Sequence, residues 1–257
     1  MSEHVLVERE GGLLTLRLNR LDKMNALTRA MYASLADALE AAEQDRGVRA
    51  VLITGGPECF TGGNDVNDFL QAPPSSTDSP VFRFMHALLD CSKPVLAAVA
   101  GPAVGIGTTL LLHCDLVYVS RDARLSTPFV NLGLCPEFGS SLILPRLLGP
   151  MRASRMLLLG ERLSGAQAVE WGLASEVLDD GAATEARARE TALRFVDLAP
   201  AAVADSKRLM RAPQREELLR VIEVEGELFN QRLRSPEAIE ALSAFTQRRT
   251  PDFSRFA

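Results

Sequence analysis

The sequence is poor in the residues that covalent cross-links and metal sites require. Its 257 residues include four cysteines and three histidines, and no two cysteines have the C-x-x-C spacing of a zinc or redox site. His113 and Asp115 flank Cys114 without the i, i+4 spacing that brings two ligands onto one face of a helix. A disulfide framework and a metal centre are therefore both disfavoured, and a reducing compartment such as the cytoplasm is expected.

Long apolar runs and an excess of positive charge are also missing. No segment has 18 uninterrupted apolar residues, and the opening MSEHVLVERE lacks the apolar stretch of a secretion signal. The 28 Lys and Arg are outnumbered by 33 Asp and Glu, giving a formal net charge of −5. We therefore expect a cytoplasmic enzyme or binding protein without a membrane or nucleic-acid partner.

Known nucleotide-binding and hydrolase motifs are absent as well. Gly101, Gly105 and Gly107 do not fit G-x-G-x-x-G, because Leu110 stands at the third glycine position counted from Gly105. No G-K-[ST] follows these glycines, and G-x-S-x-G does not occur. A dinucleotide site, a P-loop and a Ser-His-Asp hydrolase are thus unsupported.

Short β-rich runs alternate with helical patterns over the first two-thirds of the chain. A helix is expected after Thr28, which can cap it, and another after Ser79-Pro80. APPSSTDSP at 72–80 predicts a mobile loop, and GIGTTLLLHC at 105–114 predicts a further helix. Strands are predicted at 4–10, 13–19, 49–55, 93–101 and 115–120. Such alternation predicts an α/β fold with crossover connections.

The chain is almost wholly helical in pattern from Thr184 onward. Before it, Ser164 and Gln167 form a capping-box pattern. Four apolar residues of the late helix share one face: Leu218, Ile222, Phe229 and Leu233. We predict an α/β core over 1–195 and a helical region over 196–257, whose spare apolar residues pack on a partner subunit or on the chain's own core.

Two glycine-rich turns follow predicted buried strands, CFTGGND at 59–65 and GPAVGIGTT at 101–109. Glycine allows positive φ and a close approach of the backbone to a ligand. Where the second turn enters a helix, the first amides lack an intrahelical acceptor and can bind an anion or a developing oxyanion. A plain strand-to-helix turn explains the same glycines.

One carboxylate, Glu137, stands in the stretch NLGLCPEFGS among Leu132, Leu134, Cys135 and Phe138. Burial among apolar side chains raises the pKa of a carboxyl and makes its ionised form a stronger base. The alternative is a glutamate near a helix N-terminus that interacts with the helix dipole.

Four motifs in order resemble the enoyl-CoA hydratase/isomerase (crotonase) family: FTGGND, AGPAVGIGTTLLLHCD, STPFVNLGLCPEFGSS and GERLSGAQAVEWGLASEVL. The resemblance includes NRLDKMNALT near the start and RRTPDFS near the end. It implies a crotonase-like spiral of β-β-α units with a C-terminal helical oligomerisation region. It also implies a homotrimer or dimer of trimers that acts on acyl-CoA thioesters, with coenzyme A as part of the substrate and no separate cofactor or metal.

Carried over by position, the resemblance implies that the backbone amides of Asn64 and Ile106 hold the thioester oxygen as it becomes an enolate. Many family members have glycine at the second position, and a backbone donor tolerates Ile106 if the side chain points away. Substrate-binding positions implied in the same way are Lys23, Met24, Ala26, Gly62, Gly63, Asp65, Val66, Gly105, Phe129 and Leu132.

The acids of the hydrating family members are missing. Their positions fall on Thr109 and Phe129, which cannot transfer the protons of hydration, whereas Glu137 resembles the base of the Δ3,Δ2-enoyl-CoA isomerases. The predicted function is isomerisation of 3-enoyl-CoA to 2-trans-enoyl-CoA with Glu137 as the proton shuttle. A hydratase or other crotonase-type acyl-CoA enzyme, and a non-catalytic acyl-CoA binder, are the alternatives. Asp65 and Asp68 are expected to be turn and cap residues.

Overall fold

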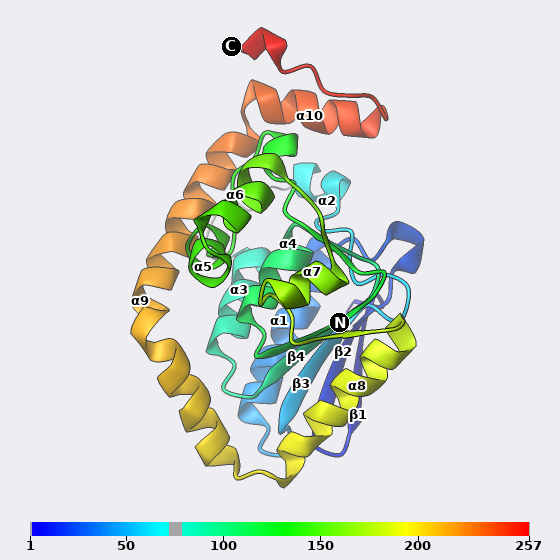
Figure 1. The fold of residues 1–257 in the computed structure, drawn as a ribbon, viewed down its shortest axis with the longest axis vertical. Coiled ribbons are helices and arrows are strands. Elements are labelled where there is room, and N and C mark those ends of the chain that lie inside the picture. Colours follow the sequence, from blue (N-terminus) through cyan, green and yellow to red (C-terminus); the bar gives the residue numbers. More distant parts are fainter. Residues whose placement is uncertain (1, 72–78, 257) are drawn as a thin grey trace.

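A six-stranded sheet forms the centre of the computed structural model, which describes residues 2–71 and 79–256 (Figure 1). Its strand order is β1-β2-β3-β4-β6-β9, with β1 and β2 antiparallel and the later neighbours parallel. The strands are β1 Val5–Glu10, β2 Leu13–Leu18, β3 Ala50–Thr54, β4 Val95–Val99, β6 Leu116–Ser120 and β9 Glu176–Leu178. Strands β3 and β4 are buried along their whole length, as their unbroken apolar runs predict. The predicted α/β class is confirmed.

A second, three-stranded sheet of order β5-β7-β8 lies outside the predicted strands. It consists of β5 Pro102–Val104, β7 Arg124–Ser126 and β8 Leu163–Ser164. Strands of two or three residues are too short to show alternation, which is why the sequence pattern does not reveal them. Because β5 lies inside GPAVGIGTT, that segment contains a short strand between glycines, which the alternative of a plain strand-to-helix turn did not include.

Helices cover both faces of the large sheet. Helix α8 packs on β3, β4 and β6, and α1 and α3 pack against each other on the opposite side. The helices are α1 Arg29–Gln44, α2 Val66–Gln71, α3 Pro80–Asp90, α4 Ile106–Thr109, α5 Ser140–Leu148, α6 Pro150–Leu159, α7 Gly165–Glu170, α8 Gly181–Arg194, α9 Pro200–Leu233 and α10 Pro236–Thr246. Short 3₁₀ turns are η1 Leu21–Lys23, η2 Leu110–His113, η3 Val130–Leu132, η4 Phe195–Asp197 and η5 Ser254–Phe256. Most of the loop predicted at 72–80 lies outside the described residues.

The capping residues read from the sequence act as expected. The Thr28 side chain accepts from the Met31 amide at the start of α1. Ser164 and Gln167 form the complete capping box of α7. Each cap satisfies amides that have no partner within the helix, so local sequence sets these boundaries.

The C-terminal helical region shares its core with the rest of the chain. Helix α9 arches along the outer edge of the molecule past α5, and α10 lies at the end that carries the C-terminus (Figure 1). Ile222 and Phe229 of α9 are buried in the same apolar cluster as α1 and α3. The division at 195/196 falls within η4 and stays a prediction. Among the described residues, no helix combines the length and hydropathy needed to cross a lipid bilayer.

Candidate active site

The two glycine-rich segments lie side by side. Thr61 and Ala103 form a parallel bridge, in which the Val104 amide donates to the Thr61 carbonyl oxygen at 3.1 Å. Gly63 has φ +96°, and a Cβ there would lie 2.9 Å from the Val104 carbonyl oxygen. Glycine is therefore required for the close contact between the segments.

The amides of Asn64 and Ile106 have no hydrogen-bond acceptor among the described residues, whereas the amide of Gly105 donates to Ser126 at 2.8 Å. Ile106 begins α4, where a helix leaves its first amides unpaired. The Ile106 side chain is fully buried in the core, so it leaves the amide unobstructed. These two N–H groups are the candidate oxyanion pair; their convergence on one oxygen stays a prediction.

Glu137 lies between η3 and α5 and is 7% exposed. The surrounding cavity is lined by Val81, Phe82, Met85, Phe138, Ile222, Gly226, Phe229 and Asn230. The expectation of a buried acid is confirmed, but α3 and α9 supply most of the apolar wall rather than neighbours in sequence. Chain segments far apart in sequence thus exclude water from this carboxyl.

The Glu137 carboxyl is electrostatically unusual. Its Oε1 is buried and has no hydrogen-bond partner among the described residues. Burial, and secondarily the charge of Glu225, raises the pKa of Glu137 to about 8. Glu225 of α9 accepts hydrogen bonds from the amides of Gly139, at 2.5 Å, and Ser141, at 2.9 Å. The side chain that accepts from these amides at the start of α5 is therefore that of Glu225.

Tyr32 of α1 is hydrogen-bonded to the first glycine segment and is absent from the sequence-based site. It is 1% exposed, and its hydroxyl donates to Asn64 Oδ1 at 2.5 Å. Burial, and then the charge of nearby Glu137, raises the pKa of Tyr32. A buried tyrosine needs a partner for its hydroxyl, but only the fold reveals that the partner is Asn64.

The predicted substrate-binding residues of the first loop lie beside the first glycine segment. Lys23 and Met24 are exposed, and Ala26 is partly buried. The Gly62 amide donates to the Met24 carbonyl oxygen at 2.7 Å. Asn25, which the sequence reasoning missed, is fully buried and donates to the Cys59 carbonyl oxygen at 2.8 Å. The two loops are therefore fixed to each other.

The acids that follow Asn64 have structural partners. Asp65 forms an ion pair with Arg20 at 2.7 Å and accepts from the amide of Asp68 at 3.0 Å, near the start of α2. Asp68 accepts from the Arg29 amide at 2.7 Å. The turn and cap role expected of Asp65 is confirmed, whereas Asp68 bonds a remote amide at the start of α1. Val66 is the first residue of α2.

The remaining predicted positions lie around α4 and η3. Gly105 has φ +57° and precedes α4, and a Cβ there would lie 3.9 Å from the ring of Phe129. The Leu132 amide donates to the Phe129 carbonyl oxygen at 3.0 Å. Thr109, at one of the two positions of the hydratase acids, is fully buried, and its hydroxyl oxygen has no partner among the residues that the structure describes. Phe129 is buried too. Since these two positions hold threonine and phenylalanine, neither supplies an acid side chain.

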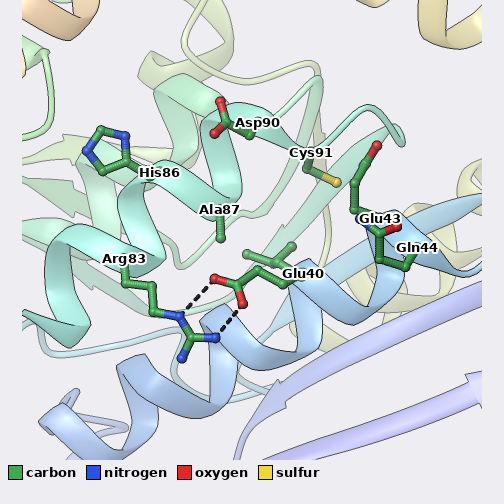
Figure 2. A pocket seen from close by; sticks show the side chains of 9 residues that line it. Glu40, Glu43, Gln44, Arg83, His86, Ala87, Asp90 and Cys91 are labelled. Carbon is green, nitrogen blue, oxygen red and sulfur yellow. Dashed lines mark hydrogen bonds and ion pairs between the residues drawn. The ribbon is translucent and has the colours of Figure 1, made fainter. Parts of the chain in front are cut away.

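A separate surface hollow of about 430 Å³ lies between α1 and α3 and contains none of these residues. Figure 2 shows Arg83 paired with Glu40 in this hollow, and Asp90 is another of the residues that line it. Glu43 adds a further acid. Because CoA is anionic and Arg83 is already engaged by Glu40, this hollow is a poor match for a CoA ester.

The fold and this site define an α/β protein of the crotonase class, which has two backbone amides without an acceptor among the described residues and a buried acid, Glu137. The family model described as enoyl-CoA hydratase/isomerase matches residues 8–255, and the chain belongs to that family. The structure of OdaA from Pseudomonas aeruginosa, 66% identical, matches with a TM-score of 0.95 over 96% of this chain and 100% of that one. The crotonase fold is thereby confirmed.

Two curated relatives differ in their named reactions. Human enoyl-CoA delta isomerase 2 is 35% identical over 256 residues, which cover 96% of this chain and 64% of that protein's length. The 2,3-dehydroadipyl-CoA hydratase of Escherichia coli (strain K12) is 35% identical over 254 residues, which cover 98% of this chain and 99% of that protein. The chain is thus a crotonase-family acyl-CoA enzyme, and overall similarity does not decide between isomerase and hydratase.

Proposed function

We propose that this protein isomerises 3-enoyl-CoA to 2-trans-enoyl-CoA, with Glu137 as the catalytic acid-base group. The buried carboxyl of Glu137 carries this proposal, because its Oε1 has no hydrogen-bond partner in the part of the chain that the structure describes. It is supported by Thr109 and Phe129, which replace the two acids of hydrating members. Lys23, Met24, Ala26, Gly62, Asp65, Val66, Gly105 and Leu132 would contribute to the acyl-CoA site.

The proposed reaction moves one proton and one double bond. The Asn64 and Ile106 amides hold the thioester oxygen while ionised Glu137 removes an α-proton, and the negative charge spreads over oxygen and the α- and γ-carbons. Protonated Glu137 then returns the proton to the γ-carbon, which leaves the double bond conjugated with the thioester. No electrons enter or leave, so the reaction requires no redox cofactor. Exclusion of water protects the intermediate and strengthens the base.

Product analysis with two substrates tests the proposal. We expect purified protein to convert a 3-enoyl-CoA to the conjugated 2-enoyl-CoA, followed by ultraviolet absorbance and chromatography. A 2-enoyl-CoA should give little 3-hydroxyacyl-CoA, because neither Thr109 nor Phe129 can activate water. Hydration as the dominant reaction would favour the hydratase alternative, and binding without turnover of either ester would favour the non-catalytic binder.

We further propose that the chain assembles as a trimer or a dimer of trimers. Large apolar side chains are exposed on α6, α9 and α10: Met151, Leu158, Leu159, Val224, Leu228, Ile239 and Phe245. Burying them between symmetry-related chains removes apolar surface from water. Light scattering should give three or six times the mass of one chain, and a monomer at assay concentration would contradict this prediction.

A further inference from the structure

The two residues after Glu137 have an uncommon backbone conformation. Phe138 has φ +56° and Gly139 has φ +72°, both in the left-handed region. Glycine adopts it freely, but a bulky side chain such as Phe138 does so only when its surroundings hold it there. A Cβ at Gly139 would lie 2.3 Å from Leu218 of α9, so this turn also packs tightly on the long helix.

His113 holds the carbonyl end of the peptide unit between Phe138 and Gly139. Its Nε2 donates to the Phe138 carbonyl oxygen at 2.8 Å, and the two rings stack with centroids 3.8 Å apart. Burial lowers the pKa of His113 to about 3, so the ring is neutral and carries its proton on Nε2. His113 ends η2, which directly follows α4 and its candidate oxyanion amide at Ile106.

Glu225 holds the amide end of the same peptide unit. It is 6% exposed, and its carboxylate accepts from the amides of Gly139 and Ser141 at 2.5 and 2.9 Å. No cation pairs with Glu225 among the described residues, so the amides at the start of α5 are its compensation. Both polar groups of one peptide are thus bound by buried side chains from different elements.

We propose that His113 and Glu225 are positioning residues that fix Glu137 by holding the Phe138–Gly139 peptide from its two ends. This inference rests on the proposed role of Glu137. A rotation of this peptide would swing the Glu137 side chain relative to the Asn64 and Ile106 amides. Misplacement of a reacting group by about 1 Å can cost on the order of a hundredfold in rate.

His113 and Glu225 differ in charge, so their substitutions should affect the pKa of Glu137 differently. The titratable groups facing Glu137 are Tyr32 of α1, Cys135 of its own loop and Glu225 of α9. The side chains of α3 in this cavity are apolar. Removing the negative charge of Glu225 should therefore lower the pKa of Glu137, whereas replacing neutral His113 should leave that pKa nearly unchanged.

The experiment combines steady-state kinetics with a carboxyl titration by carbon-13 NMR, in which Glu137→Gln identifies the signal. In the parent protein the Glu137 signal should titrate near pH 8. Glu225→Gln should move this midpoint to lower pH and reduce kcat at the high-pH plateau by about tenfold to a hundredfold. His113→Leu should reduce kcat similarly without moving the midpoint, and His113→Gln, which keeps an N–H donor, should recover part of the loss. KM should change little in all three.

Glu185→Gln on α8 is the matched control, because Glu185 is a partly buried acid that pairs with Arg17. It should leave both kcat and the midpoint unchanged. An unmoved midpoint in Glu225→Gln, or plateau kcat values within twofold of the parent in both Glu225→Gln and His113→Leu, would overturn the inference. If Glu225→Gln does not fold, Glu225→Asp replaces it, because aspartate keeps the charge but has a shorter side chain. In Glu225→Asp, kcat should fall while the titration midpoint of Glu137 stays near the parent value. A parental kcat in this variant would count against the inference. The titration needs no turnover, so failure of the parent to isomerise 3-enoyl-CoA would contradict the proposed function separately.

Discussion

Glu137→Gln should lower kcat for 3-enoyl-CoA isomerisation by on the order of a hundredfold to ten-thousandfold, or more. Glutamine keeps the size and hydrogen-bonding outline of the side chain but cannot accept the α-proton. The loss is large because the proposed mechanism uses the same group to remove one proton and return it at another carbon. Rates of conjugated thioester formation measure the effect, and calorimetry with a saturated acyl-CoA should show nearly unchanged binding.

Asp68, an acid in α2, provides the control for this substitution. Asp68 accepts from the Arg29 amide, so Asp68→Asn should affect stability more than turnover. Near-parental isomerisation by Glu137→Gln would end the assignment of Glu137. Asp65 would then be the next acid to test, although its ion pair with Arg20 engages it elsewhere.

Protein stability offers a second readout of the Glu137→Gln variant. The folded-state pKa of Glu137, about 8, lies above the ordinary value of 4.5, so folding favours the protonated form. The free energy of unfolding that Glu137 contributes in this way is fully present below its unfolded-state pKa. It is lost as pH rises through the folded-state pKa of about 8. The parent should lose roughly 5 kcal/mol of unfolding free energy over that window through this group, and Glu137→Gln should lack the loss. Denaturant titrations at several pH values compare the two proteins.

Gly63→Ala should reduce kcat by about a hundredfold to a thousandfold, as expected for loss of one oxyanion donor. The residue has φ +96°, and the added Cβ would lie 2.9 Å from the Val104 carbonyl oxygen. Relief of this contact requires movement of the peptide that carries the Asn64 amide. Steady-state kinetics should show the loss mainly in kcat, because the interaction strengthens as the enolate forms.

Gly172→Ala separates this effect from general backbone strain. Gly172 has φ +83°, and a Cβ there meets no atom within 4 Å. Both substitutions should cost about 1–2 kcal/mol of unfolding free energy through the left-handed backbone. Only Gly63→Ala should lose activity; equal activities in the two variants would remove the Asn64 amide from the proposed oxyanion site.

Local signals in the sequence are sufficient for much of the large sheet and its helices. The buried runs of β3 and β4 and the caps at Thr28 and Ser164 depend on neighbouring residues, so they can be read directly. The small sheet was missed because its strands are short and are held by pairing with distant segments. The length of such strands is set by tertiary contacts rather than by propensity.

The candidate site, too, has residues that the sequence predicts and partners that only the fold reveals. Family motifs point to Asn64, Ile106 and Glu137, and the structure adds Tyr32, which donates to the Asn64 side chain and whose pKa is raised by burial and by the charge of Glu137. The partners of these groups come from remote helices and could not be read from spacing. Glu225 lies 88 positions after Glu137 in the numbering, and neither its contact with Gly139 nor the cavity wall on α3 has a local sequence signal.

The proposed oxyanion site has an evolutionary consequence, because both of its hydrogen-bond donors belong to the main chain. Every residue except proline carries an N–H, so most side-chain mutations leave the donors in place. Ile106 illustrates this, since its side chain faces the core and its amide keeps no partner among the described residues. By contrast, an acid side chain at a position such as 109, 129 or 137 can be gained or lost by the mutation of a single codon. A fold of this kind can therefore keep its substrate-binding amides while mutations of the acid side chains change the reaction.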